Sequence, residues 1–217
     1  MLRAALALLG LVVAALIGAQ LALPRLAERR IAGDLRATGD VEHVGVSAFP
    51  AVKLLWDRAD RVEVRMSEAR AGTGKLAKLL RDTRATRELD ARVELLQVGP
   101  LVLRDLRLNK QGDRLDGEGS VATADLAAAL PSGLGVRPLA TDDGQLVLEA
   151  TAGLFGLRAA FRARLLARDG ALVIAPDGML AGIGSLTVFS DPRIEVTRVG
   201  SRSRDDGFTL LAEGRLL

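Results

Sequence analysis

The sequence contains no cysteine, no tyrosine, a single histidine and only six aromatic residues among its 217 positions. Without cysteine it cannot form a disulfide framework, a thiolate zinc site, an iron–sulfur site or a cysteine nucleophile. The lone histidine, His43, excludes any site that needs two imidazoles. A core must therefore consist mainly of Leu, Val, Ile and Ala, and the length suggests one domain or two small ones.

Charges of the two signs nearly balance, with 30 Lys and Arg against 27 Asp and Glu, and 26 of the 30 basic residues are Arg. The guanidinium fork of Arg binds phosphate oxygens bidentately, so the excess of Arg fits phosphate recognition. A GC-rich genome gives the same excess, because its codons favour Arg, Ala and Gly together. The ratio alone leaves both explanations open.

The longest apolar run extends from Ala4 to Leu23, and Gln20 is its only polar residue. Twenty residues at helical rise span about 30 Å, the thickness of the hydrocarbon core of a bilayer. Residues 1–23 therefore fit a signal peptide, a retained transmembrane anchor or, less simply, a buried helix. The cleavage signal at Ile17-Gly18-Ala19 is weak, which favours retention as an anchor. We expect residues 24–217 to form a single β-rich domain.

The orientation of this segment is not fixed by its flanking charges. Arg3 and the amino terminus lie on one side, and Arg25, Arg29 and Arg30 lie on the other. The positive-inside rule by itself would allow the domain to face the cytoplasm.

Beyond this run, helical periodicity over residues 24–37 predicts an amphipathic helix that starts at Pro24 and ends at Gly39. The period then changes to two, most clearly from Glu88 to Leu95, where apolar and charged residues alternate without a break. Asp-Gly and similar turn signals between such segments indicate an antiparallel meander. The predicted strands cover residues 41–48, 61–68, 88–95, 101–108, 117–123, 144–152, 157–166, 172–175, 194–201 and 208–215.

The helices predicted after the membrane-length run, including short ones at 75–82 and 125–130, are too few to cover the apolar face of so many strands. The sheet must therefore either fold on itself as a sandwich or barrel, or curve around a groove. A groove for acyl chains would also explain the aliphatic, ring-poor composition.

The sequence has no positive signature of an enzyme. The string Ala71-Gly72-Thr73-Gly74-Lys75 lacks the first glycine and the Ser or Thr of a phosphate-binding loop. In a strand, Glu42 and His43 would point to opposite faces, so they do not form a catalytic pair. We therefore expect no enzymatic activity, no cofactor and no metal site.

Basic residues concentrate between Lys53 and Arg87, where ten basic and five acidic residues give a local charge of +5. On a helical wheel Lys75, Lys78 and Arg81 oppose three leucines, as in a helix at the interface of an anionic membrane. A solvated surface helix has the same pattern. Nucleic acid is a weaker partner, because Trp56 is the only ring in this stretch.

The order of segments along the chain resembles the LmeA-like phospholipid-binding family of bacterial cell-envelope proteins. The resemblance rests on "RLAERRIAGDL", "VGVSAFPAVKLLWDRADRVEVRM", "LDARVELLQVGPL", "SVATADLAAAL", "FRARLLARDGALVIAPDGM" and "IEVTRVGSRSRDDGFTLLAEGRL", in that order. Two departures are Ala48, where that family usually has glycine before Phe-Pro, and a longer, more basic connection over residues 69–87.

The resemblance implies an α+β fold, mostly antiparallel β, in which an elongated curved meander sheet wraps partly around an N-terminal helix, similar to tubular lipid-binding domains. It also implies an extracytoplasmic domain at the plasma membrane, anchored or secreted, that binds anionic phospholipid and supports assembly of envelope lipids and glycans. Proteins of envelope biosynthesis are then candidate partners.

On this hypothesis three groups of residues form the lipid site. Phe49, Leu55 and Trp56 form a mouth that dips into the membrane interface. Arg58, Arg61, Lys75 and Lys78 meet the phosphate headgroup. The tails contact the inward side chains of Val62, Val64, Met66, Val93, Leu95, Leu148, Phe161 and Leu165.

Two other functions stay open. One is a membrane-tethered scaffold of an envelope complex, with a closed core and no lipid. The other is a hydrolase acting on envelope glycans, which needs two carboxylates facing each other across a cleft. The sequence nominates no such pair. An aliphatic groove open near Trp56 would favour lipid binding, and a solid core would favour the scaffold.

Overall fold

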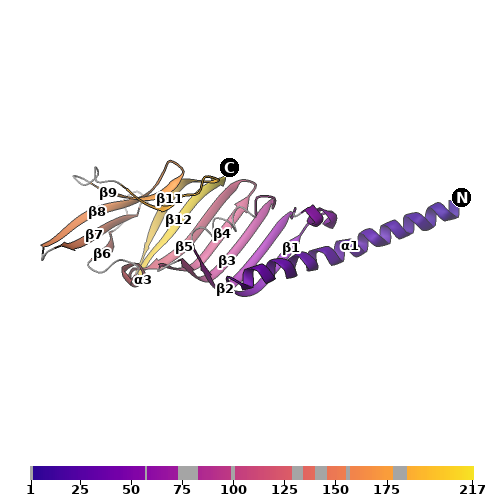
Figure 1. Cartoon of the computed structure of the whole chain (residues 1–217), viewed down its shortest axis with the longest axis horizontal. Helices are drawn as coiled ribbons and strands as arrows, with labels where there is room; N and C mark the ends of the chain where they lie inside the picture. Colours follow the sequence, from indigo (N-terminus) through magenta and orange to yellow (C-terminus); the bar gives the residue numbers. More distant parts are fainter. Residues whose placement is uncertain are drawn as a thin grey trace.

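One long helix, α1 (Leu2–Arg36), precedes all the strands and extends well beyond them at its N-terminal end (Figure 1). The computed structural model describes residues 2–56, 58–72, 83–98, 101–128, 134–139, 146–154, 157–177 and 185–217. Pro24 lies inside α1, so the prediction that a separate helix starts there is wrong. The apolar run and the amphipathic segment form one continuous helix. No helix in the described part of the chain is long and apolar enough to span a bilayer.

The strands after α1 form two sheets. The larger has the order β1-β2-β3-β4-β5-β12-β11 and the smaller has the order β10-β9-β8-β7-β6. The other elements are β1 (Gly39–Ser47), the 3-10 helix η1 (Ala51–Trp56), β2 (Arg61–Ala71), β3 (Glu88–Val98), β4 (Leu101–Gln111), β5 (Arg114–Ala122), α3 (Thr123–Ala128), β6 (Leu134–Leu139), β7 (Val147–Leu154), β8 (Leu157–Arg168), β9 (Ala171–Pro176), β10 (Leu186–Phe189), β11 (Ile194–Arg204) and β12 (Gly207–Leu216).

The expected fold class is confirmed in its main features, an α+β chain of mostly antiparallel strands with an N-terminal helix. The expected simple meander is wrong, because β2 and β3 pair in parallel. A parallel pair needs a crossover connection, here residues 72–87, whereas a hairpin turn suffices for an antiparallel pair. The helix predicted at 75–82 lies outside the described residues, and the helix predicted at 125–130 corresponds to α3.

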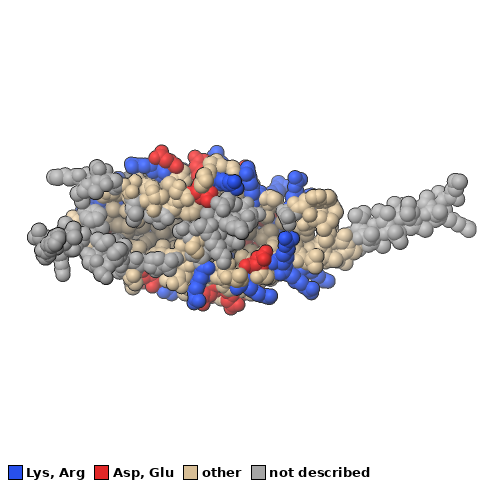
Figure 2. All heavy atoms as spheres, viewed as in Figure 1, with Lys and Arg blue, Asp and Glu red and all other residues tan. Residues whose placement is uncertain are grey.

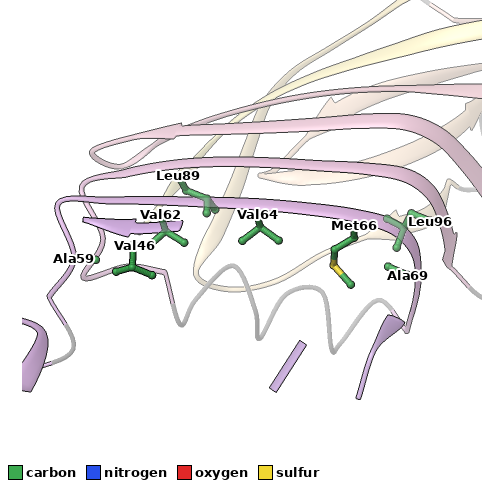
Figure 3. Packing of buried hydrophobic residues seen from close by; sticks show 8 residues of the cluster. All are labelled: Val46, Ala59, Val62, Val64, Met66, Ala69, Leu89 and Leu96. Atoms are coloured by element: carbon green, nitrogen blue, oxygen red, sulfur yellow. The ribbon is translucent and has the colours of Figure 1, made fainter. Parts of the chain in front are cut away.

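The core has two main parts. Under α1, the half-buried side chains of Ala27, Ile31 and Leu35 pack against a cluster of buried residues from the segment β1 to β3. Figure 3 shows the buried side chains of this cluster. Between the two sheets lies a second cluster around Val121 and Phe208 of the larger sheet and the neighbouring strands of the smaller one. The sheets therefore pack face to face at one end of the molecule, and α1 covers the larger sheet at the other end.

A line of irregularities crosses the strands under α1. The buried positions of β2 shift by one residue between Met66 and Ala69, and those of β3 shift in the same way between Val93 and Leu96. In β4 the register with β5 shifts beside Asp105, which has a φ of 52°. Because neighbouring strands shift together, their apolar side chains on both sides of the shift belong to the same cluster.

Candidate functional site

The three residues predicted to form a membrane mouth are exposed and lie at one end of the domain. Exposed fractions are 77% for Phe49, 63% for Leu55 and 66% for Trp56. Leu21 and Leu26 of α1 are also exposed, although both are large and apolar. Large exposed apolar side chains that lie close together are typical of sites that bind a membrane or another protein.

Two sets of hydrogen bonds hold the loop that carries this surface. The Gln20 side-chain oxygen accepts from the backbone N–H of Ala51 at 2.8 Å, and its nitrogen donates to the carbonyl of Ala48 at 3.1 Å. On the other side, Asp60 accepts from the backbone N–H of Phe49 at 2.6 Å and from Lys53 Nζ at 3.3 Å. These contacts fix η1 between α1 and the start of β2.

The same contacts stabilise the charged form of the Asp60 carboxyl. The hydrogen bond from the Phe49 N–H, followed by that from Lys53, lowers the pKa of Asp60 below its usual value. A hydrogen bond donated to a carboxylate favours the charged form. Asp60 is therefore fixed as an anion that anchors the mouth.

Of the four predicted headgroup residues, the structure describes two. Arg58 and Arg61 are exposed and lie just after η1, next to the mouth. Arg61 Nε lies 3.1 Å from a carboxylate oxygen of Glu63. Lys75 and Lys78 lie outside the described residues.

Most of the predicted tail-lining residues lie in the core clusters. Val62, Val64 and Met66 are buried under α1, and Val93 packs against them (Figure 3). Leu95 is half-buried and outside this cluster, where Leu96 lies instead because of the shift described above.

The remaining predicted lining residues lie on the smaller sheet. Leu148 of β7 and Leu165 of β8 are buried in the cluster between the sheets. Phe161 belongs to β8, opposite Ala150 of β7, and its side chain lies outside the described part. Leu103 of β4 packs against both clusters and joins them into one apolar strip.

Two cavities among the described residues are not aliphatic grooves. The larger, of about 250 Å³, lies between α1 and β1, and the smaller has a volume of about 10 Å³ on the β2–β3 face. Charged residues contribute to both. Neither of these two cavities is an acyl-chain groove that opens at Trp56.

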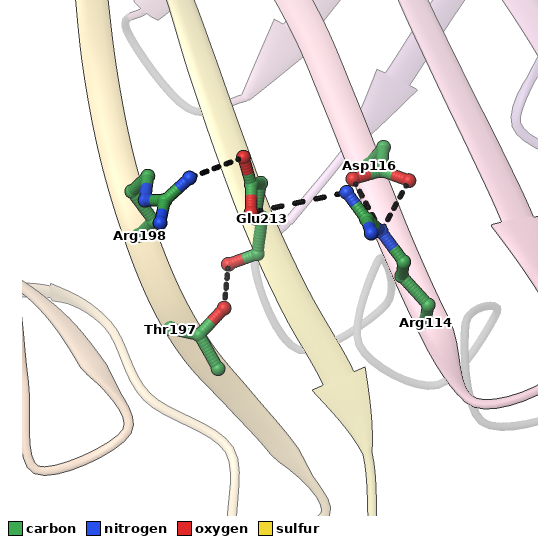
Figure 4. A network of polar contacts seen from close by, with 5 residues as sticks. All are labelled: Arg114, Asp116, Thr197, Arg198 and Glu213. Atoms are coloured by element: carbon green, nitrogen blue, oxygen red, sulfur yellow. Dashed lines mark hydrogen bonds and ion pairs between the residues drawn. The ribbon is translucent and has the colours of Figure 1, made fainter.

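Charged side chains on the outer face of the larger sheet neutralise one another. Arg114 of β5 contacts Asp116 at 3.0 Å and Glu213 of β12 at 3.9 Å, and Arg198 of β11 contacts Glu213 at 3.2 Å (Figure 4). On the face in Figure 2, Lys and Arg side chains lie along both long margins. Carboxylates held by guanidinium groups in this way do not provide the facing pair that glycan hydrolysis requires.

Sequence reasoning missed the interior position of Lys110. This residue of β4 is 2% exposed, and its Nζ donates to the backbone carbonyl of Thr86. Burial lowers the pKa of Lys110, and the nearby negative charge of Asp113 opposes this effect. The alternation of Leu106, Leu108 and Lys110 along the strand could have indicated that the Lys110 side chain points inward.

In the regions that the structure describes, no group of three or more His, Asp or Glu side chains could hold a metal ion.

Comparison with known proteins gives one match. The profile of the LmeA-like phospholipid-binding family matches residues 13–210, nearly the whole chain. No curated protein and no solved structure is similar enough to count as a match.

Proposed function

The chain belongs to the LmeA-like phospholipid-binding family, and from this membership we propose that it binds anionic phospholipid at the extracytoplasmic face of the plasma membrane. In this role it acts without catalysis and supports the assembly of envelope lipids and glycans, together with proteins of envelope biosynthesis.

The observation that carries the proposal is the contact between α1 and η1. Gln20 lies near the end of the apolar run, and its side chain bonds the loop that presents Phe49 and Trp56. If residues 1–23 cross the bilayer, the bond from Gln20 holds these rings at the membrane surface, where an indole is favoured.

The same contact argues against cleavage after residue 23. Such cleavage would remove Gln20, which is the partner of the buried N–H of Ala51, whereas cleavage at the weak signal after Ala19 would leave Gln20 as the first residue. A buried donor left without a partner costs about 1–3 kcal/mol.

We propose a tail path along the apolar strip under α1. It runs past Val62, Val64, Met66 and Val93, crosses at Leu103, and continues to Leu148 and Leu165 between the sheets, with Leu95 and Phe161 in neighbouring positions. Val62, Val64 and Met66 are buried in the cluster under α1, and Leu148 and Leu165 are buried in the cluster between the sheets. Tail entry would therefore require α1 to move away from the sheet. The headgroup would remain outside, with its phosphate near Arg58, Arg61, Lys75 and Lys78.

The packed core also favours a second function, a membrane-tethered scaffold that binds no lipid. In a scaffold of this kind α1 would remain seated on the sheet. The mouth would still contact the membrane, and exposed sheet surfaces would hold a partner protein.

Native mass spectrometry of the full chain, released from detergent with an equimolar mixture of phosphatidylglycerol and phosphatidylcholine, tests the two functions. Lipid binding predicts a bound phospholipid with a preference for phosphatidylglycerol. The variant Met66→Trp fills the space under α1 and should reduce the bound fraction. A folded chain that carries no lipid would refute lipid binding and leave the scaffold.

A further inference from the structure

The cavity between α1 and β1 has no role in the proposed lipid site. It lies on the flank of α1 that faces the edge strand of the larger sheet. Its lining residues are Glu28, Arg29, Ala32 and Arg36 of α1 and Val41, Glu42, His43 and Val44 of β1. Its volume of about 250 Å³ is below the range typical of drug-sized ligands, roughly 300–1,000 Å³, so it suits a smaller molecule.

The charges around this cavity are balanced but not paired with one another. Arg29 and Arg36 contribute two guanidinium groups, and Glu28 and Glu42 contribute two carboxylates. No ion pair joins these four side chains, all of which belong to the described part of the chain. Opposite charges that border one cavity without contact can be bridged by a ligand that carries both signs.

Both carboxylates are positioned by the backbone of β1. Glu28 Oε1 accepts a hydrogen bond from the N–H of Val46 at 3.2 Å. The register of β1 on β2 passes from Val41 opposite Met66 to His43 opposite Arg65, so Glu42 is an extra residue without a partner. A bulge of this kind redirects side chains and is frequent beside binding sites.

We propose that this cavity binds a small zwitterion with one phosphate and one ammonium group. The phosphate contacts Arg29 and Arg36, because a guanidinium fork matches phosphate oxygens. The ammonium contacts Glu42 and the remaining oxygen of Glu28. An anion alone would leave Glu42 and the remaining oxygen of Glu28 without a positively charged partner, and a cation alone would leave the two guanidinium groups without a negatively charged one.

Phosphoethanolamine has this chemistry, either as a free compound or as the headgroup of a membrane phospholipid. The site uses residues of α1 and β1 that are separate from the mouth and from the proposed tail path. It therefore does not depend on the proposed function.

His43 supplies a direct probe, because it is the only histidine and it lines the cavity. In full-length protein labelled at histidine and embedded in phosphatidylcholine nanodiscs, NMR should show one imidazole. At constant pH, O-phosphoethanolamine should shift this signal saturably. Its Kd should be at least about tenfold lower than those of inorganic phosphate and ethanolamine, because each of these makes only half of the charged contacts.

Variants separate the site from a general charge effect. Arg36→Gln and Glu42→Gln should each weaken binding about tenfold or more, and Ala32→Leu should reduce binding by filling the cavity without a change of charge. Arg30→Gln is the matched control, since Arg30 lies on α1 but does not line the cavity. Circular dichroism and unfolding midpoints establish that each variant folds.

Nanodiscs that contain phosphatidylethanolamine distinguish the two sources. Loss of the response to free O-phosphoethanolamine would identify the membrane lipid as the ligand, and an unchanged response would identify the free compound. Either result supports the site. No saturable shift, or equal affinity for inorganic phosphate, would overturn it.

Trp56 fluorescence and native mass spectrometry report on the mouth and on lipid binding separately, so failure of one proposal does not imply failure of the other.

Discussion

The side-chain oxygen of Gln20 accepts a hydrogen bond of 2.8 Å from the backbone N–H of Ala51. Gln20 is the only polar residue in the apolar run from Ala4 to Leu23, and Ala51 is the buried first residue of η1. The bond therefore ties the end of the run to the loop that exposes Phe49, Leu55 and Trp56.

Replacement of Gln20 by Leu should loosen this loop without unfolding the sheets. It removes both hydrogen bonds and leaves the Ala51 N–H buried without a partner, at a cost of about 1–3 kcal/mol. Hydrogen exchange measured by mass spectrometry should show faster exchange in residues 48–56 and no change in β4. Gln111→Leu, at an exposed position of β4, is the control and should leave residues 48–56 unchanged. Equal protection in Q20L and the wild type would contradict the role of Gln20.

The sequence predicted most strands because their alternation is strong, as in residues 61–68 and 88–95. It did not predict the parallel pairing of β2 with β3. The predicted helix at 75–82 could have indicated parallel pairing, because a helix between two strands fits a crossover connection better than a hairpin. The short strands β6 and β10 were missed, because Gly135 and Pro138 interrupt the pattern of the first and the second has only four residues.

For the candidate site, the exposed position of Phe49, Leu55 and Trp56 was predicted from the lipid-binding hypothesis, in which these side chains enter the membrane interface. The inward position of Leu96 instead of Leu95 could not be inferred, because both residues are leucine and the shift is shared with β2. The position of Gln20 depends on a contact across 31 residues of sequence. Patterns within one segment carry no information about such contacts.

Leu55→Ser should reduce immersion of the mouth in the bilayer. Complete burial of a Leu side chain contributes about 1.5–3 kcal/mol, so partial immersion contributes on the order of 1 kcal/mol. Full-length protein in nanodiscs containing brominated phosphatidylcholine reports this directly, because Trp56 is the only tryptophan and bromine quenches its emission at close range. We expect strong quenching in the wild type and weaker quenching in L55S.

Leu217→Ser is the control for this experiment. Leu217 is also exposed, but it is the C-terminal residue and lies away from η1 (Figure 1). It should leave the quenching unchanged. If Trp56 is not quenched in the wild type, the mouth does not contact the bilayer.

Charge reversal at Lys75 and Lys78 should weaken the preference for anionic lipid. A basic residue near an anionic surface contributes about 1 kcal/mol. Loss of two such residues costs about 2 kcal/mol, and the two added negative charges increase the cost, so the double reversal should lower binding to phosphatidylglycerol by at least roughly thirtyfold at low salt and by less at high salt. Native mass spectrometry with mixed lipids measures the preference. Arg202→Glu, on the exposed face of β11, is the control. An unchanged preference in the double variant would remove these lysines from the headgroup site.

Lys110 should make stability rise with pH in the alkaline range. Burial lowers its pKa in the folded chain below the unfolded value of 10.5. Between these two pKa values the unfolded chain binds more protons than the folded chain, so the free energy of unfolding increases with pH and levels off above 10.5. At neutral pH the ammonium is charged in both states, and the full desolvation cost is present.

Urea unfolding of the wild type and Lys110→Met at several pH values from 8 to 10.5 measures this dependence of stability on pH. The stability of K110M relative to the wild type should fall as the pH rises, because Met does not titrate. Parallel curves for the two proteins would show that Lys110 has the same pKa in the folded and unfolded chains.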